Sequence, residues 1–447
     1  MPVSLVLPHE VHRCYFISPI RIDNQAELLS WVASLARDTE IEAETRGTVS
    51  GILASVKAEG FEAVRRHTQA FDGVELSPAS VRVPTSAMAS ALIHLRREDP
   101  SLVEALEAMI DGVRRFALAQ RQSLSDTEVR LPGGSTVGER WVPLQRVGLY
   151  VPGGRAFYPS TLVMTAIPAQ VAGVGRIVAA TPPRPDGVGP LILATSALLG
   201  LDELLTVGGA QGIAWLAYGE PQVDLIAGPG NRFVAEAKRQ LVGTVGIDSV
   251  AGPTELLVIA DGGADPAWVA EDLLAQAEHD PDAAAVVISD DEALLQAVAR
   301  KLVARMESSP RRDILARSLQ DHGRLFLADH ETAIAFAQAW APEHLELMVR
   351  DPQRWIPALT TAGALFLGSH TAEAFGDYGA GPNHVLPTQR TARFSSPLGV
   401  ATFLKRQSVL HLNAIDATAL APGVCRLAEA EGLPHHAASA ALRAHHT

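Results

Sequence analysis

The stretch Arg146-Val-Gly-Leu-Tyr-Val-Pro-Gly-Gly154 decides the fold class, because a short apolar run ends there in a glycine turn. Further apolar runs of strand length follow, with helical segments between them. The runs cover residues 176–181, 203–207 and 223–227, and the expected helices cover 160–172, 189–199, 211–218 and 231–241. Strands that alternate with helices of this length predict βαβ units and a buried parallel sheet.

A second series of the same kind begins at Glu255-Leu-Leu-Val-Ile-Ala260. Its later strands are expected at 285–289, 324–327 and 363–368, and its helices at 266–279, 291–306 and 331–340. The sequence therefore predicts an α/β protein with two parallel sheets, each about five strands wide, and not a single barrel. The first 130 residues and the tail after residue 425 have mainly helical patterns.

Composition narrows the class of protein further. The chain has 447 residues, of which 47% are hydrophobic and 19% charged, so it buries a large core without disulfide or metal staples. Its 37 basic and 50 acidic residues give a net charge of −13, which argues against a nucleic-acid partner.

Two cysteines, Cys14 and Cys425, cannot form a disulfide framework or a cysteine-based zinc site. The first residues show no signal-peptide pattern, and no apolar run reaches the length of about 18 residues needed to span a membrane. We expect a soluble protein in the cytoplasm, with no membrane partner.

Nucleotide-binding motifs are represented only by incomplete versions. No G-x-G-x-x-G follows a strand, and no G-x-x-x-x-G-K-[ST] is present. The turn Gly228-Pro-Gly-Asn231 and the pair Gly153-Gly154 each close a strand and open a helix. Two interpretations stay open: plain turns, or helix N-termini that hold the phosphates of a ligand.

Several short polar motifs are candidates for chemistry. Gln276-Ala-Glu-His279 places an amide and an imidazole on one helix face, where they can ligate a metal ion or form a solvated helix end. Glu343-His344 precedes an apolar strand and is either an acid–base pair or a surface turn.

Two further segments combine the same residue types. The glycine-rich loop Gly376-Asp-Tyr-Gly-Ala-Gly-Pro-Asn-His384 carries a carboxylate, an amide and an imidazole. The segment Glu431-Gly-Leu-Pro-His-His436 clusters a carboxylate with two histidines, which can cap a helix or supply a ligand.

In their order and context these motifs resemble the histidinol dehydrogenase family, which carries out the last two steps of histidine biosynthesis. The match extends from about residue 45 to the C-terminus. Its motifs are Val147-Gly-Leu-Tyr-Val-Pro-Gly-Gly154, Gly208-Gly-Ala-Gln211, Gly228-Pro-Gly-Asn231, Ala251-Gly-Pro-Thr-Glu255, Gln276-Ala-Glu-His279, Ala341-Pro-Glu-His-Leu345, Gly376-Asp-Tyr378, Asn383-His-Val-Leu-Pro-Thr388 and Thr391-Ala-Arg-Phe-Ser-Ser-Pro397.

The resemblance implies a role for each matching residue. The catalytic pair would be Glu343 and His344, and the cofactor contacts Tyr150, Gln211 and Asn231. One Zn²⁺ per subunit would be bound by Gln276, His279, Asp377 and His436. Substrate contacts would come from those four ligands together with Thr254, His344 and Glu431. Thr254 stands where the family usually has serine, and Gly212 and Trp215 stand where it more often has alanines.

The resemblance also implies an assembly and a reaction. The family is a homodimer whose C-terminal segment completes the active site of the partner subunit. Its two incomplete Rossmann-like domains would be residues 45–149 with 256–393 and residues 150–255, flanked by the segments 1–44 and 394–447. NAD would oxidise L-histidinol to L-histidine through L-histidinal in two steps, with His344 as general base and Glu343 activating water in the second.

Two alternatives stay open. A paralogue would keep zinc and NAD but oxidise another small polar alcohol. A zinc hydrolase would use Glu343 to activate water and would turn over without NAD.

Overall fold

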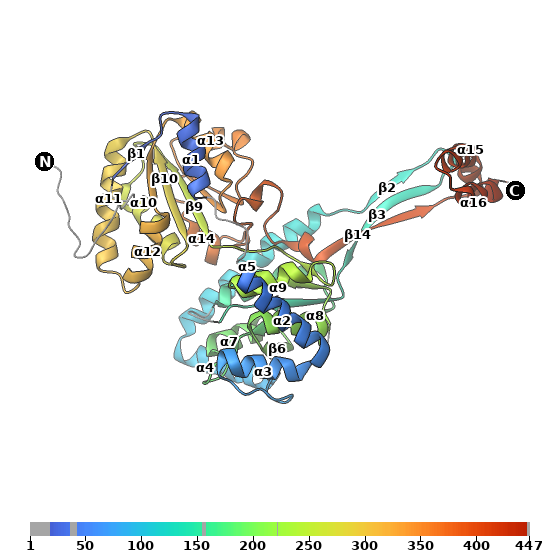
Figure 1. The fold of residues 1–447 in the computed structure, drawn as a ribbon, viewed down its shortest axis with the longest axis horizontal. Coiled ribbons are helices and arrows are strands. Elements are labelled where there is room, and N and C mark those ends of the chain that lie inside the picture. Colours follow the sequence, from blue (N-terminus) through green and yellow to red (C-terminus); the bar gives the residue numbers. More distant parts are fainter. Residues whose placement is uncertain (1–17, 36–42, 154–157, 221, 445–447) are drawn as a thin grey trace.

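The computed structural model describes residues 18–35, 43–153, 158–220 and 222–444. Cys14 and Gly154, which the sequence analysis names, lie outside the described residues. The described chain forms two α/β bodies and a long arm (Figure 1). None of its helices is both long and apolar enough to cross a membrane.

The first body is built on a six-stranded parallel sheet with the strand order β1-β11-β10-β9-β12-β13. The strands are β9 (Glu255–Ala260), β10 (Ala284–Ser289), β11 (Arg324–Leu327), β12 (His344–Met348), β13 (Ala364–Leu367) and the short β1 (Ile20–Arg21). All residues of β9, β10, β11 and β12 are buried, as expected for a parallel sheet covered on both faces.

Helices cover both faces of this sheet. One face packs on α10 (Pro266–Ala277), α11 (Glu292–Glu307) and α12 (Arg312–His322). The other face packs on α1 (Gln25–Leu35) and α13 (His330–Trp340). The short helix α14 (Glu373–Tyr378) follows β13.

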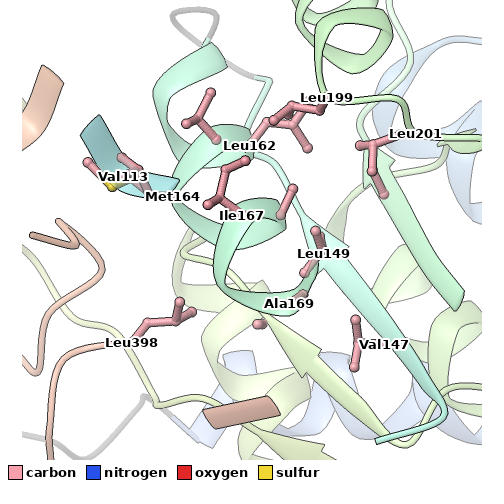
Figure 2. Close-up of a cluster of buried hydrophobic side chains, with 14 of the residues drawn as sticks. Val113, Val147, Leu149, Leu162, Met164, Ile167, Ala169, Leu199, Leu201 and Leu398 are labelled. Atoms are coloured by element: carbon pink, nitrogen blue, oxygen red, sulfur yellow. The ribbon is translucent and has the colours of Figure 1, made fainter. Parts of the chain in front are cut away.

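The second body is built on a five-stranded parallel sheet with the order β6-β5-β4-β7-β8. Its strands are β4 (Arg146–Tyr150), β5 (Arg176–Thr181), β6 (Glu203–Thr206), β7 (Leu225–Ala227) and β8 (Gly246–Ile247). Side chains of the central strand β4 point alternately to the two faces of the sheet. Val147 and Leu149 pack against α6 (Pro159–Ala172) (Figure 2), whereas Tyr150 belongs to the apolar cluster on the opposite face.

The helices between residues 43 and 123 belong to this second body. The first layer contains α4 (Thr85–Glu98), α5 (Pro100–Ser123), α6 and α7 (Pro190–Leu198). The second layer contains α2 (Ala43–Glu59), α3 (Phe61–Asp72), α8 (Gly209–Tyr218) and α9 (Arg232–Leu241). The resemblance instead grouped residues 45–149 with 256–393. The packing differs because the apolar faces of α2 and α3 are buried against α8 and α9.

The arm is a three-stranded antiparallel ribbon that carries two helices at its tip (Figure 1). Its strands are β2 (Thr127–Arg130), β3 (Thr136–Pro143) and β14 (Leu404–His411), and its tip helices are α15 (Ala414–Ala430) and α16 (Pro434–Ala444). Asp416 joins the ribbon to the tip by accepting hydrogen bonds from the backbone N–H groups of Gly133 at 2.8 Å and Ser135 at 2.9 Å. The expected α/β class with two parallel sheets is confirmed, and the ribbon is an element that the sequence analysis did not predict.

Candidate active site

Each sheet has one point where the strand order reverses. In the six-stranded sheet it lies between β9 and β12, and in the five-stranded sheet between β4 and β7. A crevice opens beside such a switch point, which is why ligands of open α/β sheets commonly bind there. The candidate residues from the sequence gather at these two places.

The two switch points use opposite ends of their strands. Thr254 and Glu343 directly precede β9 and β12, so the first cluster lies at the amino ends of its strands. Tyr150 ends β4 and Gly228 follows β7, so the second group lies at the carboxyl ends. Residues 248–254 connect the carboxyl end of β8 to the amino end of β9, a linker that spans about 25 Å at most.

Two hydrogen bonds hold these edges of the bodies together. Asn383, in the loop after α14, donates from Nδ2 to the carbonyl oxygen of Met164 in α6 at 2.6 Å. The N–H of Gly252 donates to Thr388 Oγ1 at 2.7 Å. The two switch points therefore face a common region between the bodies.

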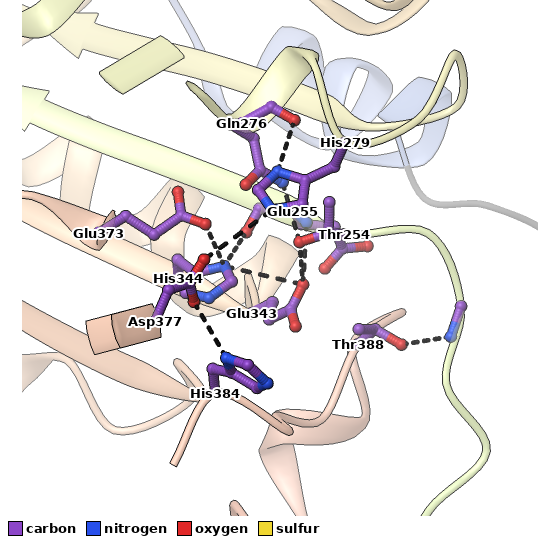
Figure 3. A network of polar contacts seen from close by, with 11 residues as sticks. Thr254, Glu255, Gln276, His279, Glu343, His344, Glu373, Asp377, His384 and Thr388 are labelled. Atoms are coloured by element: carbon purple, nitrogen blue, oxygen red, sulfur yellow. Dashed lines mark hydrogen bonds and ion pairs between the residues drawn. The ribbon is translucent and has the colours of Figure 1, made fainter. Parts of the chain in front are cut away.

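Glu343 is buried at the centre of the first cluster (Figure 3). Its Oε2 accepts a hydrogen bond from Thr254 Oγ1 at 2.5 Å and another from the backbone N–H of Glu255 at 3.1 Å. Burial raises the pKa of Glu343 to about 8, in spite of the hydrogen bond from Thr254, which lowers it. At neutral pH this carboxyl group is held mainly in its protonated form.

His344 is the neighbouring side chain, and its pKa is shifted in the opposite direction. Its Nδ1 lies 3.1 Å from the carbonyl oxygen of Glu255, which assigns the ring proton to Nδ1 and leaves Nε2 as an acceptor. Burial lowers the pKa of His344 to about 4. A neutral imidazole with a free Nε2 is the form of histidine that can accept a proton.

Helix α14 brings two carboxylates to this pair. Glu373 Oε1 lies 3.6 Å from His344 Nδ1, and Asp377 follows four residues later on the same helix face. Burial raises the pKa of Glu373 well above its usual value, and the charge of Asp377 adds to this effect. Ligand atoms of His344, Glu373 and Asp377 lie within 4.8 Å of one another, so this trio is one candidate metal-binding group.

The end of α10 provides the other expected ligands. Gln276 donates from Nε2 to Thr254 Oγ1 at 3.0 Å, and its buried Oε1 has no hydrogen-bond partner among the described residues. His279 Nε2 lies 3.9 Å from Asp377 Oδ2, while His384 Nδ1 lies 3.6 Å from Asp377 Oδ1. Figure 3 shows these side chains grouped around Asp377 and His344.

This donor set fits a divalent cation. The orphaned amide oxygen of Gln276, the imidazole of His279 and the carboxylate of Asp377 are nitrogen and oxygen ligands of the kind that first-row metals such as Zn²⁺ accept. The site also lies beside the C-terminus of α10, where the helix dipole favours positive charge.

At the second switch point the main feature is a tight backbone turn at Gly228, directly after β7. Gly228 has φ +113°, and a Cβ atom there would lie 2.1 Å from the carbonyl oxygen of Tyr150. The buried side chain of Asp248 accepts a hydrogen bond from the N–H of Gly228 at 2.7 Å. Lys238 donates to the carbonyl oxygen of Gly228 at 3.0 Å and also forms an ion pair with Asp248. The turn after β7 is thus held on both sides of one glycine.

The expected cofactor residues have structural partners here. Asn231 caps α9 by accepting from the N–H groups of Phe233 at 3.0 Å and Val234 at 3.2 Å. The hydroxyl of Tyr150 accepts from the N–H of Gly209 at the start of α8, at 3.0 Å. Gln211 Nε2 donates to Asp72 Oδ2 at 3.2 Å. Tyr150 and Asn231 therefore lie beside the N-termini of α8 and α9, where phosphate oxygens bind readily.

The expected metal ligand His436 and the expected substrate contact Glu431 are not brought to the cluster. Glu431 and His436 are exposed and lie between α15 and α16 or at the start of α16, at the tip of the arm (Figure 1). Within a single chain the structure therefore unites Thr254, Gln276, His279, Glu343, His344 and Asp377 but not the two C-terminal residues.

Sequence reasoning missed the carboxyl groups beneath the cluster. Glu373 precedes Asp377 by one helical turn, and this i, i+4 spacing was the signal that could have found it. Glu346 accepts from the N–H of Glu373 at 2.7 Å, and burial raises the pKa of its neighbour Asp272 to about 6. Glu346 sits within an apolar strand, where no pattern distinguishes it.

The chain therefore has two parallel sheets, and each has a switch point with residues suited to a ligand. One switch point holds a buried carboxyl group beside a neutral imidazole, and the other presents helix N-termini, a combination that indicates an α/β enzyme. The family model described as histidinol dehydrogenase matches residues 35–444, and the chain belongs to this family. The chain is therefore an oxidoreductase, and the resemblance read from its motifs is confirmed.

Individual relatives agree over nearly the whole length. The chain is 45% identical over 415 residues to the histidinol dehydrogenase of Nitrosospira multiformis, covering 92% of this chain and 93% of the relative. It is also 45% identical to that of Pseudomonas aeruginosa, covering 93% of each. A crystal structure of histidinol dehydrogenase from Elizabethkingia anophelis has 30% identity and a TM-score of 0.89, covering 97% of this chain and 99% of that one.

Proposed function

We propose that the chain catalyses the zinc-dependent, NAD-linked, four-electron oxidation of L-histidinol to L-histidine through L-histidinal, in histidine biosynthesis. The observation that carries the proposal is the Glu343–His344 pair, whose pKa values burial moves to about 8 and about 4. Groups whose environments separate their pKa values in this way are suited to separate proton transfers. Family membership supplies the class of reaction.

His344 is the general base of the first oxidation. Its Nδ1 proton is engaged by the carbonyl oxygen of Glu255, so Nε2 takes the hydroxyl proton of the alcohol. Its low pKa keeps it neutral, and thus able to act, throughout the neutral range. A bound NAD would supply the hydride acceptor for both oxidations.

Glu343 activates water in the second step. To act as a base it must be ionised, and two donors, Thr254 Oγ1 and the N–H of Glu255, stabilise that form. Positive charge bound by Gln276, His279 and Asp377 would lower the pKa of Glu343 further, since opposite charge nearby favours the carboxylate. The buried site keeps bulk water away from the reactive aldehyde while it waits for the second step.

Gln276, His279 and Asp377 would hold zinc, together with His436 of the partner subunit. A bound zinc ion would orient the substrate by binding the imidazole and amino groups of L-histidinol. The same residues would then contact substrate, with Thr254, His344 and Glu431 of the partner subunit. Tyr150, Gln211 and Asn231 would contact NAD at the second switch point, where the helix N-termini favour its phosphates.

The proposed homodimer accounts for the arm. The tip exposes apolar side chains that a monomer would leave in water, among them Ile415 at 69%, Leu427 at 67% and Leu442 at 65% exposed. An arm that packs these groups on a second copy would also carry Glu431 and His436 to the cluster of the partner subunit. Two cysteines in 447 residues fit the reducing cytoplasm as the compartment.

The test is the yield of NADH per mole of limiting L-histidinol, measured with zinc-loaded protein and with a chelator-stripped control. Two NADH per substrate, with L-histidine as product and loss of turnover on stripping, would establish the four-electron oxidation. One NADH per substrate, or turnover only of other alcohols, would indicate a paralogue. Hydrolytic turnover without NAD would overturn the proposal in favour of a hydrolase.

A further inference from the structure

Three polar groups form a chain whose direction is fixed by the backbone. The N–H of Glu255 donates to Glu343 Oε2 at 3.1 Å, so this oxygen acts as an acceptor. Thr254 Oγ1 donates its only proton to the same oxygen, at 2.5 Å. The hydroxyl of Thr254 has no second proton to give.

The orientation of the Gln276 amide follows from that direction. Because Thr254 Oγ1 can only accept from Gln276, the amide presents its NH₂ group to the hydroxyl, at 3.0 Å. The carbonyl oxygen of the amide must then point the other way. The side chain is fully buried, and Oε1 has no hydrogen-bond partner among the described residues.

An unpartnered amide oxygen in a buried site is unfavourable unless something else binds it. The backbone of Gln276 also orients the second expected ligand, His279. The carbonyl oxygen of Gln276 lies 3.3 Å from His279 Nδ1, which leaves His279 Nε2 free toward Asp377. Both free atoms thus lie on the side of the proposed cation, and each is oriented by a contact behind it.

We infer that Thr254 is a positioning residue for the metal. Its hydroxyl fixes the Gln276 amide with Oε1 toward the cation, and this contact sets metal affinity independently of any contact between Thr254 and substrate. The inference rests on the zinc site of the proposed function. It also gives the methyl group of Thr254 no role, so the hydroxyl alone carries the effect.

The test compares Thr254→Val, which keeps the shape and removes the hydroxyl, with Thr254→Ser, which keeps the hydroxyl. The dissociation constant for Zn²⁺ is measured on the full chain by competition with a chromophoric chelator. The Val variant should bind Zn²⁺ about 10–100-fold more weakly than wild type, as is typical when an outer-shell partner is lost, and the Ser variant should stay within about threefold. Equal affinities for wild type and the Val variant would overturn the inference.

A second variant isolates the orientation of the amide. In Gln276→Glu both side-chain oxygens are equivalent, so a flip no longer removes the ligand. Adding Thr254→Val to this background should change Zn²⁺ affinity by less than about threefold, which a double-mutant cycle detects. A full loss in that background would show a general structural effect and would refute the inference, as would a Val variant whose metal-free thermal midpoint falls in step with its affinity.

The two proposals fail separately. Wild type that binds Zn²⁺ but yields no NADH from L-histidinol would refute the proposed function and leave the role of Thr254 standing. Wild type that yields two NADH, with a Val variant of undiminished Zn²⁺ affinity, would refute only the role of Thr254.

Discussion

The two sheets contribute to the active site in opposite ways. The six-stranded sheet offers the amino ends of β9 and β12, where the buried side chains of Glu343 and His344 have shifted pKa values and are the proposed catalytic pair. The five-stranded sheet offers the carboxyl ends of β4 and β7, where a glycine turn and two helix N-termini face the same region. Only the second sheet follows the usual rule that ligands bind at carboxyl ends.

Helix dipoles explain why the two edges suit different ligands. At the amino edge of a βαβ sheet the returning helices end, and their C-termini favour cations. Gln276 and His279 lie at such an end, beside the proposed zinc site. At the carboxyl edge the helices begin, and α8 and α9 direct N–H groups toward any phosphate. Two similar sheets that present opposite edges would thus give one chain both the proposed cation site and the proposed anion site.

We expect the chemical step to be lost only when residues at the amino edge of the six-stranded sheet are replaced. His344→Asn should lower kcat by about 10²–10⁴-fold, because the general base is removed, while Zn²⁺ affinity stays within about threefold. Steady-state kinetics and zinc content measure the two effects, with the exposed His370→Asn as a matched control outside the cluster. Loss of zinc as well would assign His344 to the metal, together with Glu373 and Asp377.

At the carboxyl edge the structure predicts a different kind of failure. Lys238→Met leaves the buried Asp248 without its cation and should cost about 3–5 kcal/mol of folding stability, read as a lower thermal midpoint. Replacing both residues, Lys238→Met with Asp248→Leu, should recover most of that stability, since an apolar pair avoids the unpaired charge.

Both variants should raise the KM for NAD, because Lys238→Met removes the donor to the carbonyl oxygen of Gly228 and the double variant also removes the acceptor of its N–H group. The Zn²⁺ affinity should not change in either. An unchanged KM for NAD in the stable double variant would separate the turn after β7 from cofactor binding.

Much of this arrangement could be predicted from the sequence. The buried strands of both sheets are short apolar runs, and the motifs Gly228-Pro-Gly-Asn231 and Glu343-His344 lie beside strand ends, as expected. The strand order was not predictable, so the sequence did not show that Thr254 and Glu343 begin neighbouring strands. The ribbon was missed because most residues of β2 and β14 are exposed and give no apolar run.

The site was predictable to the extent that its residues are local. Gln276 and His279 share one helix, and Glu343 and His344 are adjacent, so their motifs were visible. The link from Gln276 through Thr254 to Glu343 joins residues up to 89 positions apart and needs the fold. Glu431 and His436 lie exposed at the tip of the arm, so a single chain does not bring them to this cluster, and only the proposed dimer would.

The pH dependence of folding stability tests the shifted pKa values of Glu343 and His344 at the amino edge. The pKa of Glu343 is raised from 4.5 to about 8 by folding. Its contribution to the free energy of unfolding is therefore complete below about pH 4.5 and is lost as pH rises toward 8. The pKa of His344 is lowered from 6.5 to about 4, so its contribution is lost only as pH falls below 6.5. Between pH 6.5 and 8 only the effect of Glu343 remains from this pair.

Metal-free wild type should therefore lose about 2 kcal/mol more stability than Glu343→Gln between pH 6.5 and pH 8, because the variant cannot ionise. Thermal midpoints of both proteins at the two pH values measure the difference. Parallel midpoints would mean that Glu343 is already ionised at neutral pH, and the separation of the two pKa values would no longer support the mechanism.

The smallest predicted effect tests the anion site alone. Asn231→Asp keeps a side-chain oxygen that caps α9, so folding stability should change by only a few tenths of a kcal/mol. Its negative charge would oppose a pyrophosphate at the same N-terminus and should raise the KM for NAD by about tenfold, with a smaller effect at high salt. Asn231→Ser, a neutral cap, should stay within about threefold of wild type. If the Asp variant binds NAD as tightly as the Ser variant, the phosphates do not lie at α9, and the contrast between a cation edge and an anion edge fails on the cofactor side.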